Sequence, residues 1–243
     1  MNILVIGESC KDIFHYGDCR RLCPEAPVPV FNSSRLTQNG GMATNVYNNI
    51  ISLGSQASLH TNDNYQDITK TRFVDERTNH MFMRLDKNDN QYGFCDLRGV
   101  DFTQYDAVVV SDYNKGFLST KDLEYISNSH DVTFLDTKKT LGDWCNNFSY
   151  IKINVHEFEK SAHLVNNSLI KKIIITLGRD GCRYQDSLYS VPLVEVKDAS
   201  GAGDTFVASL AVKYCETRDI QESIIFANQV STMVVQKLGV ATL

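Results

Sequence analysis

Long apolar runs, paired cysteines and an excess of positive charge are all missing from this 243-residue sequence. No stretch approaches the length of a transmembrane helix, and the first ten residues become polar too soon for a secretory signal. The seven cysteines include no CxxC pair and no zinc-site spacing, so we expect reduced thiols and no zinc. The sequence therefore predicts a cytoplasmic protein that binds no membrane.

The net charge and the absence of common nucleotide-binding motifs argue against further classes of protein. The formal net charge of −5 at pH 7 argues against nucleic acid as the main partner. The six histidines show neither the spacing of a metal site nor that of a catalytic triad. The Walker pattern GxxxxGK[ST] and the dinucleotide pattern GxGxxG are both absent, so any nucleotide site must rest on another scaffold.

The second half of the chain alternates short apolar runs with segments of helical periodicity. This alternation predicts an α/β fold with a doubly wound, mostly parallel sheet that is covered on both faces. Ligands bind beyond the carboxyl ends of such strands, so polar residues there, such as Asp112, are candidates for a site. The expected strands lie near 105–113, 132–137, 150–154 and 171–178, and the expected helices near 119–128, 156–166, 203–216 and 219–237.

The first half predicts the rest of one domain, 1–243, and a small β lid. Residues 2–7 predict a buried strand, and 40–54 predict a helix that opens at a Gly-Gly pair and closes at a glycine. Residues 13–38 and 71–87 are typical of short exposed strands and turns, and the first of these segments contains three prolines.

The sequence DASGAGDTF, residues 198–206, suggests phosphate chemistry. Gly201 and Gly203 let a ligand approach the backbone, and the amide groups of Ala202, Gly203 and Asp204 at a helix start form an anion site. A carboxylate beside bound phosphate repels it, so Asp204 is better suited to take a proton from an attacking hydroxyl. The alternative is a tight turn in which Asp204 only caps the helix.

Four segments together resemble the ribokinase-like (PfkB) carbohydrate kinases: DASGAGDTF, NGGMATNVYNNIISLG, IITLGRDG and NVHEF. Others resemble the heptose 7-phosphate kinases within that family, namely YGDCRRLCPEAPVPVF, TKTRFV, MRLD, VVVSDYNKGFL and the ending VVQKLGVATL. The resemblance implies ATP and Mg²⁺ as cofactors, and phosphoryl transfer to O1 of D-glycero-β-D-manno-heptose 7-phosphate for surface-glycan precursors. It also implies a homodimer formed through the lid.

The resemblance implies roles for individual residues. A helix cap remains the alternative for Asn154 and Glu157, a turn for Asp12, and solvated surface for Arg84 and Lys115. The expected sugar-side residues are Asp12, Gly40, Gly41, Asn45, Arg84, Asp112 and Lys115, with Arg84 and Lys115 on the distal phosphate. The expected nucleotide-side residues are Asn154, Glu157, Thr176, Gly178, Gly181 and Asn228, with Glu157 also on magnesium.

Three departures from the family pattern leave alternatives open. The chain is compact, because almost nothing separates residues 51–63 from Thr69, where the family has further sheet and helix. DTKKT replaces the usual Asp-Pro-Lys-Gly, and no HxGH nucleotidyltransferase motif is present. The alternatives are a kinase for another sugar or a nucleoside, and a non-catalytic homologue that binds sugar or nucleotide.

Overall fold

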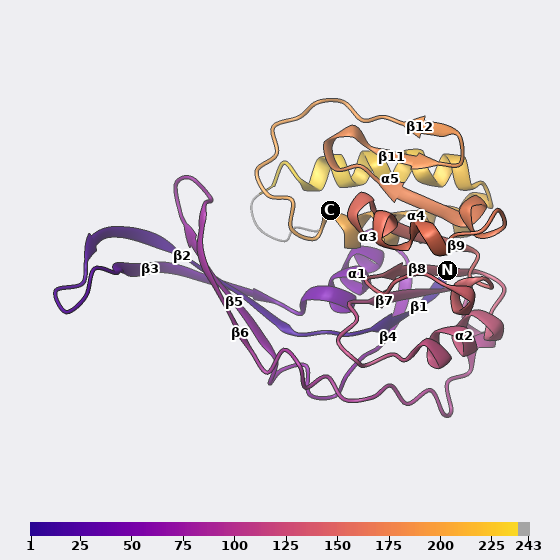
Figure 1. Cartoon of the computed structure of the whole chain (residues 1–243), viewed down its shortest axis with the longest axis horizontal. Coiled ribbons are helices and arrows are strands. Elements are labelled where there is room, and N and C mark those ends of the chain that lie inside the picture. Colours follow the sequence, from indigo (N-terminus) through magenta and orange to yellow (C-terminus); the bar gives the residue numbers. More distant parts are fainter. Residues whose placement is uncertain (238–243) are drawn as a thin grey trace.

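An eight-stranded sheet with helices on both faces forms the body of the protein in the computed structural model, which describes residues 1–237 (Figure 1). Six neighbouring strands run parallel, namely β4, β1, β7, β8, β9 and β10. The strands β11 and β12 add an antiparallel hairpin at one edge. In spatial order the strands are β4 (Gln56–His60), β1 (Asn2–Gly7), β7 (Ala107–Asp112), β8 (Thr133–Thr137), β9 (Tyr150–Asn154), β10 (Ile173–Thr176), β11 (Cys182–Tyr184) and β12 (Ser187–Tyr189).

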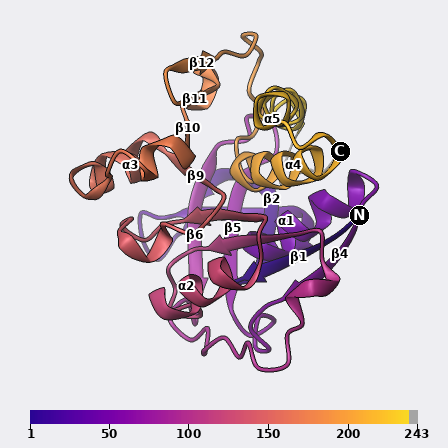
Figure 2. The same ribbon diagram turned by 90° about the vertical axis from the view of Figure 1, so that its right-hand side faces the viewer.

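Successive residues of each central strand bury opposite faces of the sheet. Ile3 and Val5 of β1 pack with the cluster under α1 (Gly41–Ser52), α4 (Ala202–Thr217) and α5 (Ile220–Val234). Leu4 and Ile6 pack with the cluster under α2 (Thr120–Ser129) and α3 (Val155–Ser161), on the other side of the sheet (Figure 2). All six residues of β7 are buried, as expected for a parallel strand covered on both faces.

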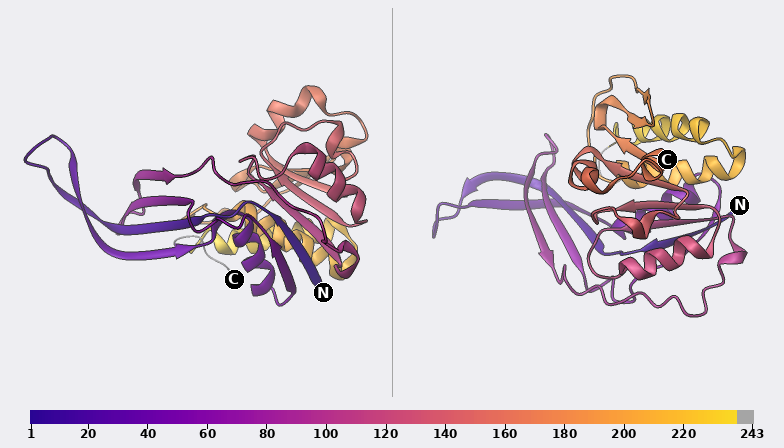
Figure 3. Two further views of the ribbon diagram at one scale, coloured as in Figure 1. Left: turned by 90° about the horizontal axis from the view of Figure 1, so that it is seen from below. Right: turned by 45° about the vertical axis from the view of Figure 1, so that its right-hand side comes forward.

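A separate four-stranded sheet, the β lid, projects from the body as long ribbons (Figure 3). Its order is β3 (Pro29–Asn39), β2 (Lys11–Leu22), β5 (Thr69–Asp75) and β6 (Met81–Lys87), which covers the expected segments 13–38 and 71–87. The register puts Asp12, Phe14, Lys70, Arg72 and Arg84 on one face and Leu36, His15, Phe73, Met83 and Leu85 on the other.

The predicted α/β fold is confirmed, with three local differences. Strand β4 was not predicted, because QASLH is short and only partly buried at the edge of the sheet. Helix α3 ends at Ser161 and continues as a 3₁₀ turn, and α5 ends at Val234 rather than near 237. The last six residues of the motif VVQKLGVATL lie outside the described residues. No helix within residues 1–237 is long and apolar enough to cross a membrane.

Candidate active site

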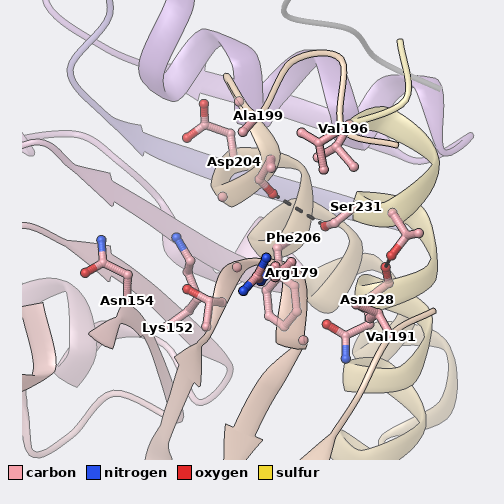
Figure 4. A pocket seen from close by; sticks show the side chains of 18 of the residues that line it. Lys152, Asn154, Arg179, Val191, Val196, Ala199, Asp204, Phe206, Asn228 and Ser231 are labelled. Carbon is pink, nitrogen blue, oxygen red and sulfur yellow. Dashed lines mark hydrogen bonds between the residues drawn. The ribbon is translucent and has the colours of Figure 1, made fainter. Parts of the chain in front are cut away.

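A cavity of about 650 Å³ opens at the carboxyl ends of β8, β9 and β10, beside the start of α4. One wall is the glycine turn before α4, and another is α5 together with the loop 191–196 (Figure 4). Lys152 and Asp204 lie toward one end of it, and Asn228 and Val191 toward the other. The predicted residues that line this cavity are Asn154, Thr176, Gly178, Gly181, Gly201, Ala202, Gly203, Asp204 and Asn228.

The glycine turn has the backbone geometry that an anion site needs. Gly201 has a φ of +80°, which strains any residue with a side chain, and α4 begins immediately after it. A Cβ atom added to Gly203 would lie 2.8 Å from Nζ of Lys152. The first amide groups of α4 and a lysine ammonium therefore meet at one point, where they can stabilise negative charge.

Asp204 is buried in the first turn of α4 and accepts a hydrogen bond at each carboxylate oxygen. Asn45 Nδ2 donates to Oδ2 at 2.8 Å, and the Tyr113 hydroxyl donates to Oδ1 at 2.9 Å. Burial raises the pKa of Asp204 to about 6, and the charge of Asp136 acts in the same direction. The bonds from Asn45 and Tyr113 and the charge of Lys152 oppose that rise. A carboxylate with this pKa is suited to act as a base near neutral pH.

Two lysines that sequence reasoning missed stand beside Asp204. Lys152 pairs with Asp136 at 2.8 Å, and both side chains are buried. Lys138 pairs with Glu157 at 2.9 Å, and its ammonium lies 5.0 Å from the centre of the Tyr113 ring. Both lysines line the cavity, so two ammonium groups, each paired with a carboxylate, stand at the end near Asp204.

Asn154 and Glu157 form a reciprocal cap at the start of α3. The Asn154 side chain accepts from the Glu157 amide at 2.9 Å, and Glu157 accepts from the Asn154 amide at 2.8 Å. Burial would raise the pKa of Glu157, but the hydrogen bond from the Asn154 amide and the Lys138 ammonium lower it. The helix cap that was the alternative for Asn154 and Glu157 is therefore present, and Asn154 also lines the cavity. The described residues contain no cluster of three or more acidic, histidine or cysteine side chains that could hold a metal.

Of the predicted nucleotide-side residues, Asn154, Thr176, Gly178, Gly181 and Asn228 line the cavity, whereas Glu157 does not. Gly178 and Gly181 have φ values of +62° and +90°, which fit a tight turn after β10. A Cβ atom at Gly181 would lie 2.1 Å from the carbonyl oxygen of Tyr189, so only glycine fits there. Asn228 of α5 donates to that same carbonyl at 2.9 Å, which fixes the loop that follows β12.

On the sugar side, Asp12, Gly40, Gly41 and Asn45 lie near one another at the base of the lid. Asp12 is buried and forms an ion pair with Arg72 of β5. Gly41 has a φ of +50°, and a Cβ atom there would lie 3.3 Å from the Cβ of Asp12. Asp112, in contrast, is buried and paired with Lys139 at 2.7 Å, away from the cavity lining.

Lys115 belongs to a cluster that also includes Lys70, Asp89 and Tyr92. Lys70 pairs with Asp89 at 2.5 Å, Lys115 pairs with its other oxygen, and the Tyr92 hydroxyl donates to Asp89 at 2.8 Å. Burial would raise the pKa of Asp89, but these bonds lower it to about 2. Arg84 does not join this cluster, since it pairs with Asp86 at 2.8 Å on the outer strand β6.

Similarity to known proteins identifies the class. The model of the pfkB family of carbohydrate kinases matches residues 69–243. The chain therefore belongs to the pfkB carbohydrate kinase family, whose members use ATP to phosphorylate sugars.

Among individual proteins, the chain is 31% identical over 294 aligned residues to the bifunctional protein HldE of Helicobacter acinonychis. The alignment covers 98% of this chain but 64% of that protein. Since 294 aligned positions exceed the 243 residues of the chain, the relative carries stretches that this chain lacks, in line with its predicted compactness.

Solved structures agree on the ribokinase-like fold. A putative ribokinase from Agrobacterium tumefaciens superposes with a TM-score of 0.74 at 14% identity, covering 98% of this chain and 92% of the other. The ribokinase of Arabidopsis thaliana, complexed with ribose and ATP, gives 0.72 at 13% identity, covering 98% and 93%.

Proposed function

We propose that this kinase transfers the γ-phosphoryl group of ATP to O1 of D-glycero-β-D-manno-heptose 7-phosphate. The observation that carries the chemistry is a buried carboxylate, Asp204, in the same helix turn as a glycine anion site and beside Lys152. The resemblance of the sequence to heptose 7-phosphate kinases and the similarity to HldE support the choice of sugar.

The reaction follows from the arrangement of these groups. Asp204 accepts the proton of the sugar O1 hydroxyl as that oxygen attacks the γ-phosphorus. A new O–P bond forms, the bond from the γ-phosphorus to the bridging oxygen breaks, and ADP leaves with that oxygen. The amide groups of Gly203 and Asp204 and the ammonium of Lys152 stabilise the charge on the migrating group.

The distal phosphate of the sugar suits the cations at the base of the lid. The lid supplies Lys70 and Arg72, and the loop after β7 supplies Lys115. Both lysines pair with Asp89, and the arginine pairs with Asp12. Charge-assisted bonds from lysine and arginine are the usual means of holding a phosphate group. Arg84 shares the lid face of Arg72, one strand further out.

The nucleotide suits the cavity beside the start of α4, with its phosphates toward the glycine turn and its base toward Asn228 and the loop 191–196. Glu157 fits a hydrated magnesium ion, because such an ion needs one or two carboxylates and takes its other ligands from water and phosphates. Bound there, magnesium would neutralise charge on the phosphates, and Lys138 would hold the Glu157 carboxylate in its ionised form.

A coupled assay that measures ADP release tests the proposal across a panel of acceptors. Heptose 7-phosphate should give the highest kcat/KM, and unphosphorylated heptose a much lower one. If ribose or a nucleoside is the best acceptor, the protein is a kinase for another sugar or a nucleoside, and the heptose assignment is wrong. Tight binding of ATP without ADP release on any acceptor would indicate a non-catalytic homologue.

A further inference from the structure

The hydroxyl of Tyr113 contacts the proposed base directly. It donates to Asp204 Oδ1 at 2.9 Å across 91 residues of sequence, and the other oxygen accepts from Asn45. We propose that Tyr113 is a positioning residue whose hydroxyl fixes the Asp204 carboxylate in orientation and favours its ionised form. This inference rests on the proposed role of Asp204 as the base.

Tyr113 is itself held from several sides. Its backbone N–H donates at 2.8 Å to Glu8, a fully buried carboxylate that follows β1. The other oxygen of Glu8 accepts from the Lys115 amide at 2.9 Å, so one carboxylate fixes the turn that carries Tyr113 and Lys115. The Lys138 ammonium lies 5.0 Å from the ring centre. These contacts hold both the backbone and the ring of Tyr113 in place.

The bond still leaves Asp204 able to accept a proton. A carboxylate has about four lone-pair sites on its two oxygens. Tyr113 occupies one site on Oδ1 and Asn45 one site on Oδ2, so each oxygen keeps further capacity for an acceptor hydroxyl. With both bonds in place the carboxylate has little freedom to rotate, which keeps its remaining lone pairs in a constant direction.

Several ionisable groups act on Asp204, and they do not act alike. Asp136 of β8 opposes its ionisation, while Lys152 of β9 and Lys138, which follows β8, favour it. Burial and the charges of Asp204 and Asp136 raise the pKa of Tyr113 well above its ordinary value, and the hydrogen bond to Asp204 acts in the same direction. Tyr113 therefore stays protonated and can donate throughout the range in which Asp204 titrates.

The decisive experiment titrates Asp204 directly in the full chain. Protein labelled with ¹³C at the aspartate carboxyl carbons is followed by NMR against pH, and Asp204→Asn assigns the signal. Tyr113→Phe keeps the ring and removes the hydroxyl, which should raise the pKa of Asp204 by about one unit, the size expected for one hydrogen bond to a charged group. Tyr125→Phe, at an exposed site on α2, is the matched control.

Activity gives a second, separate measurement. In Tyr113→Phe the acid limb of the pH profile of kcat/KM should move upward by the same amount, kcat should fall and the KM for ATP should stay constant. An Asp204 signal and a pH profile that both match wild type in a folded variant would overturn the inference. If Tyr113→Phe does not fold, Tyr113→Leu replaces it. Wild-type protein inactive on every acceptor would reject the proposed function, while the NMR titration would still decide the role of Tyr113.

Discussion

Lys152 lies so close to Gly203 that a Cβ atom at Gly203 would come within 2.8 Å of its Nζ atom. The ammonium is buried, is held by Asp136 and lines the cavity at the start of α4. A strand and a helix that begin 52 residues apart thus direct a cation and a set of amide groups at the same point. Two substitutions can test this arrangement.

Lys152→Met should lower kcat by about 10²-fold, because a stabilising charge at the migrating group is lost. Gly203→Ala should act similarly, since its methyl group displaces the ammonium from its position against Asp136. Steady-state kinetics with varied ATP measure both effects. The control is Lys121→Met, at an exposed site on α2. Unchanged kcat in Lys152→Met would remove Lys152 from the mechanism.

Activity should depend on pH through Asp204. The base is the carboxylate, so kcat/KM should fall as the pH drops through about 6, the pKa to which burial raises this group. The effect on stability has the opposite sign, because the folded protein holds the proton more tightly than the unfolded chain does. The contribution of Asp204 to the free energy of unfolding is largest below its ordinary pKa of 3.8 and is lost as the pH rises through about 6. Urea unfolding of wild type and Asp204→Asn across this range measures it.

Lys70→Ala and Lys115→Ala should each raise the KM for a phosphorylated sugar by about 10- to 100-fold, the cost of one charge-assisted bond. The KM for the same sugar without its phosphate should change little. Each lysine contacts Asp89, so the double variant should show less than the sum of the two effects. Equal losses on both sugars would show that the cluster maintains the lid rather than binds phosphate.

The lid face that points away from Asp12 predicts a homodimer. Leu36, Met83 and Leu85 are exposed on this face, next to stacked rings of His15 and Phe73 with centroids 5.3 Å apart. A four-stranded sheet this exposed gains stability when a copy of itself covers the apolar face.

Light scattering at micromolar concentration should therefore give the mass of a dimer. Met83→Asp should dissociate it and lower activity, whereas Leu188→Asp, on the exposed hairpin strand β12, should leave the mass unchanged. A monomer in the presence of ATP and sugar would exclude the dimer.

The sequence was sufficient for features that depend on local patterns. Uninterrupted apolar runs such as AVVV predicted the parallel strands, and two glycines before a periodic segment predicted the turn at α4. Contacts between distant segments could not be predicted from the sequence, because they depend on the order of the strands. Examples are the contacts of Tyr113 with Asp204, of Lys152 with Asp136 and of Arg72 with Asp12. The one local signal was that Tyr113 and Lys152 lie within two residues of predicted site residues at strand ends.

Turnover by Asp204→Asn with ATP and heptose 7-phosphate at pH 7.5 tests the role of Asp204 most directly. Loss of the general base should lower kcat by about 10²- to 10⁴-fold, while ATP binding measured by calorimetry stays close to wild type. Asp131→Asn, at an exposed position before β8, should behave as wild type. A kcat for Asp204→Asn close to that of wild type would exclude Asp204 as the base.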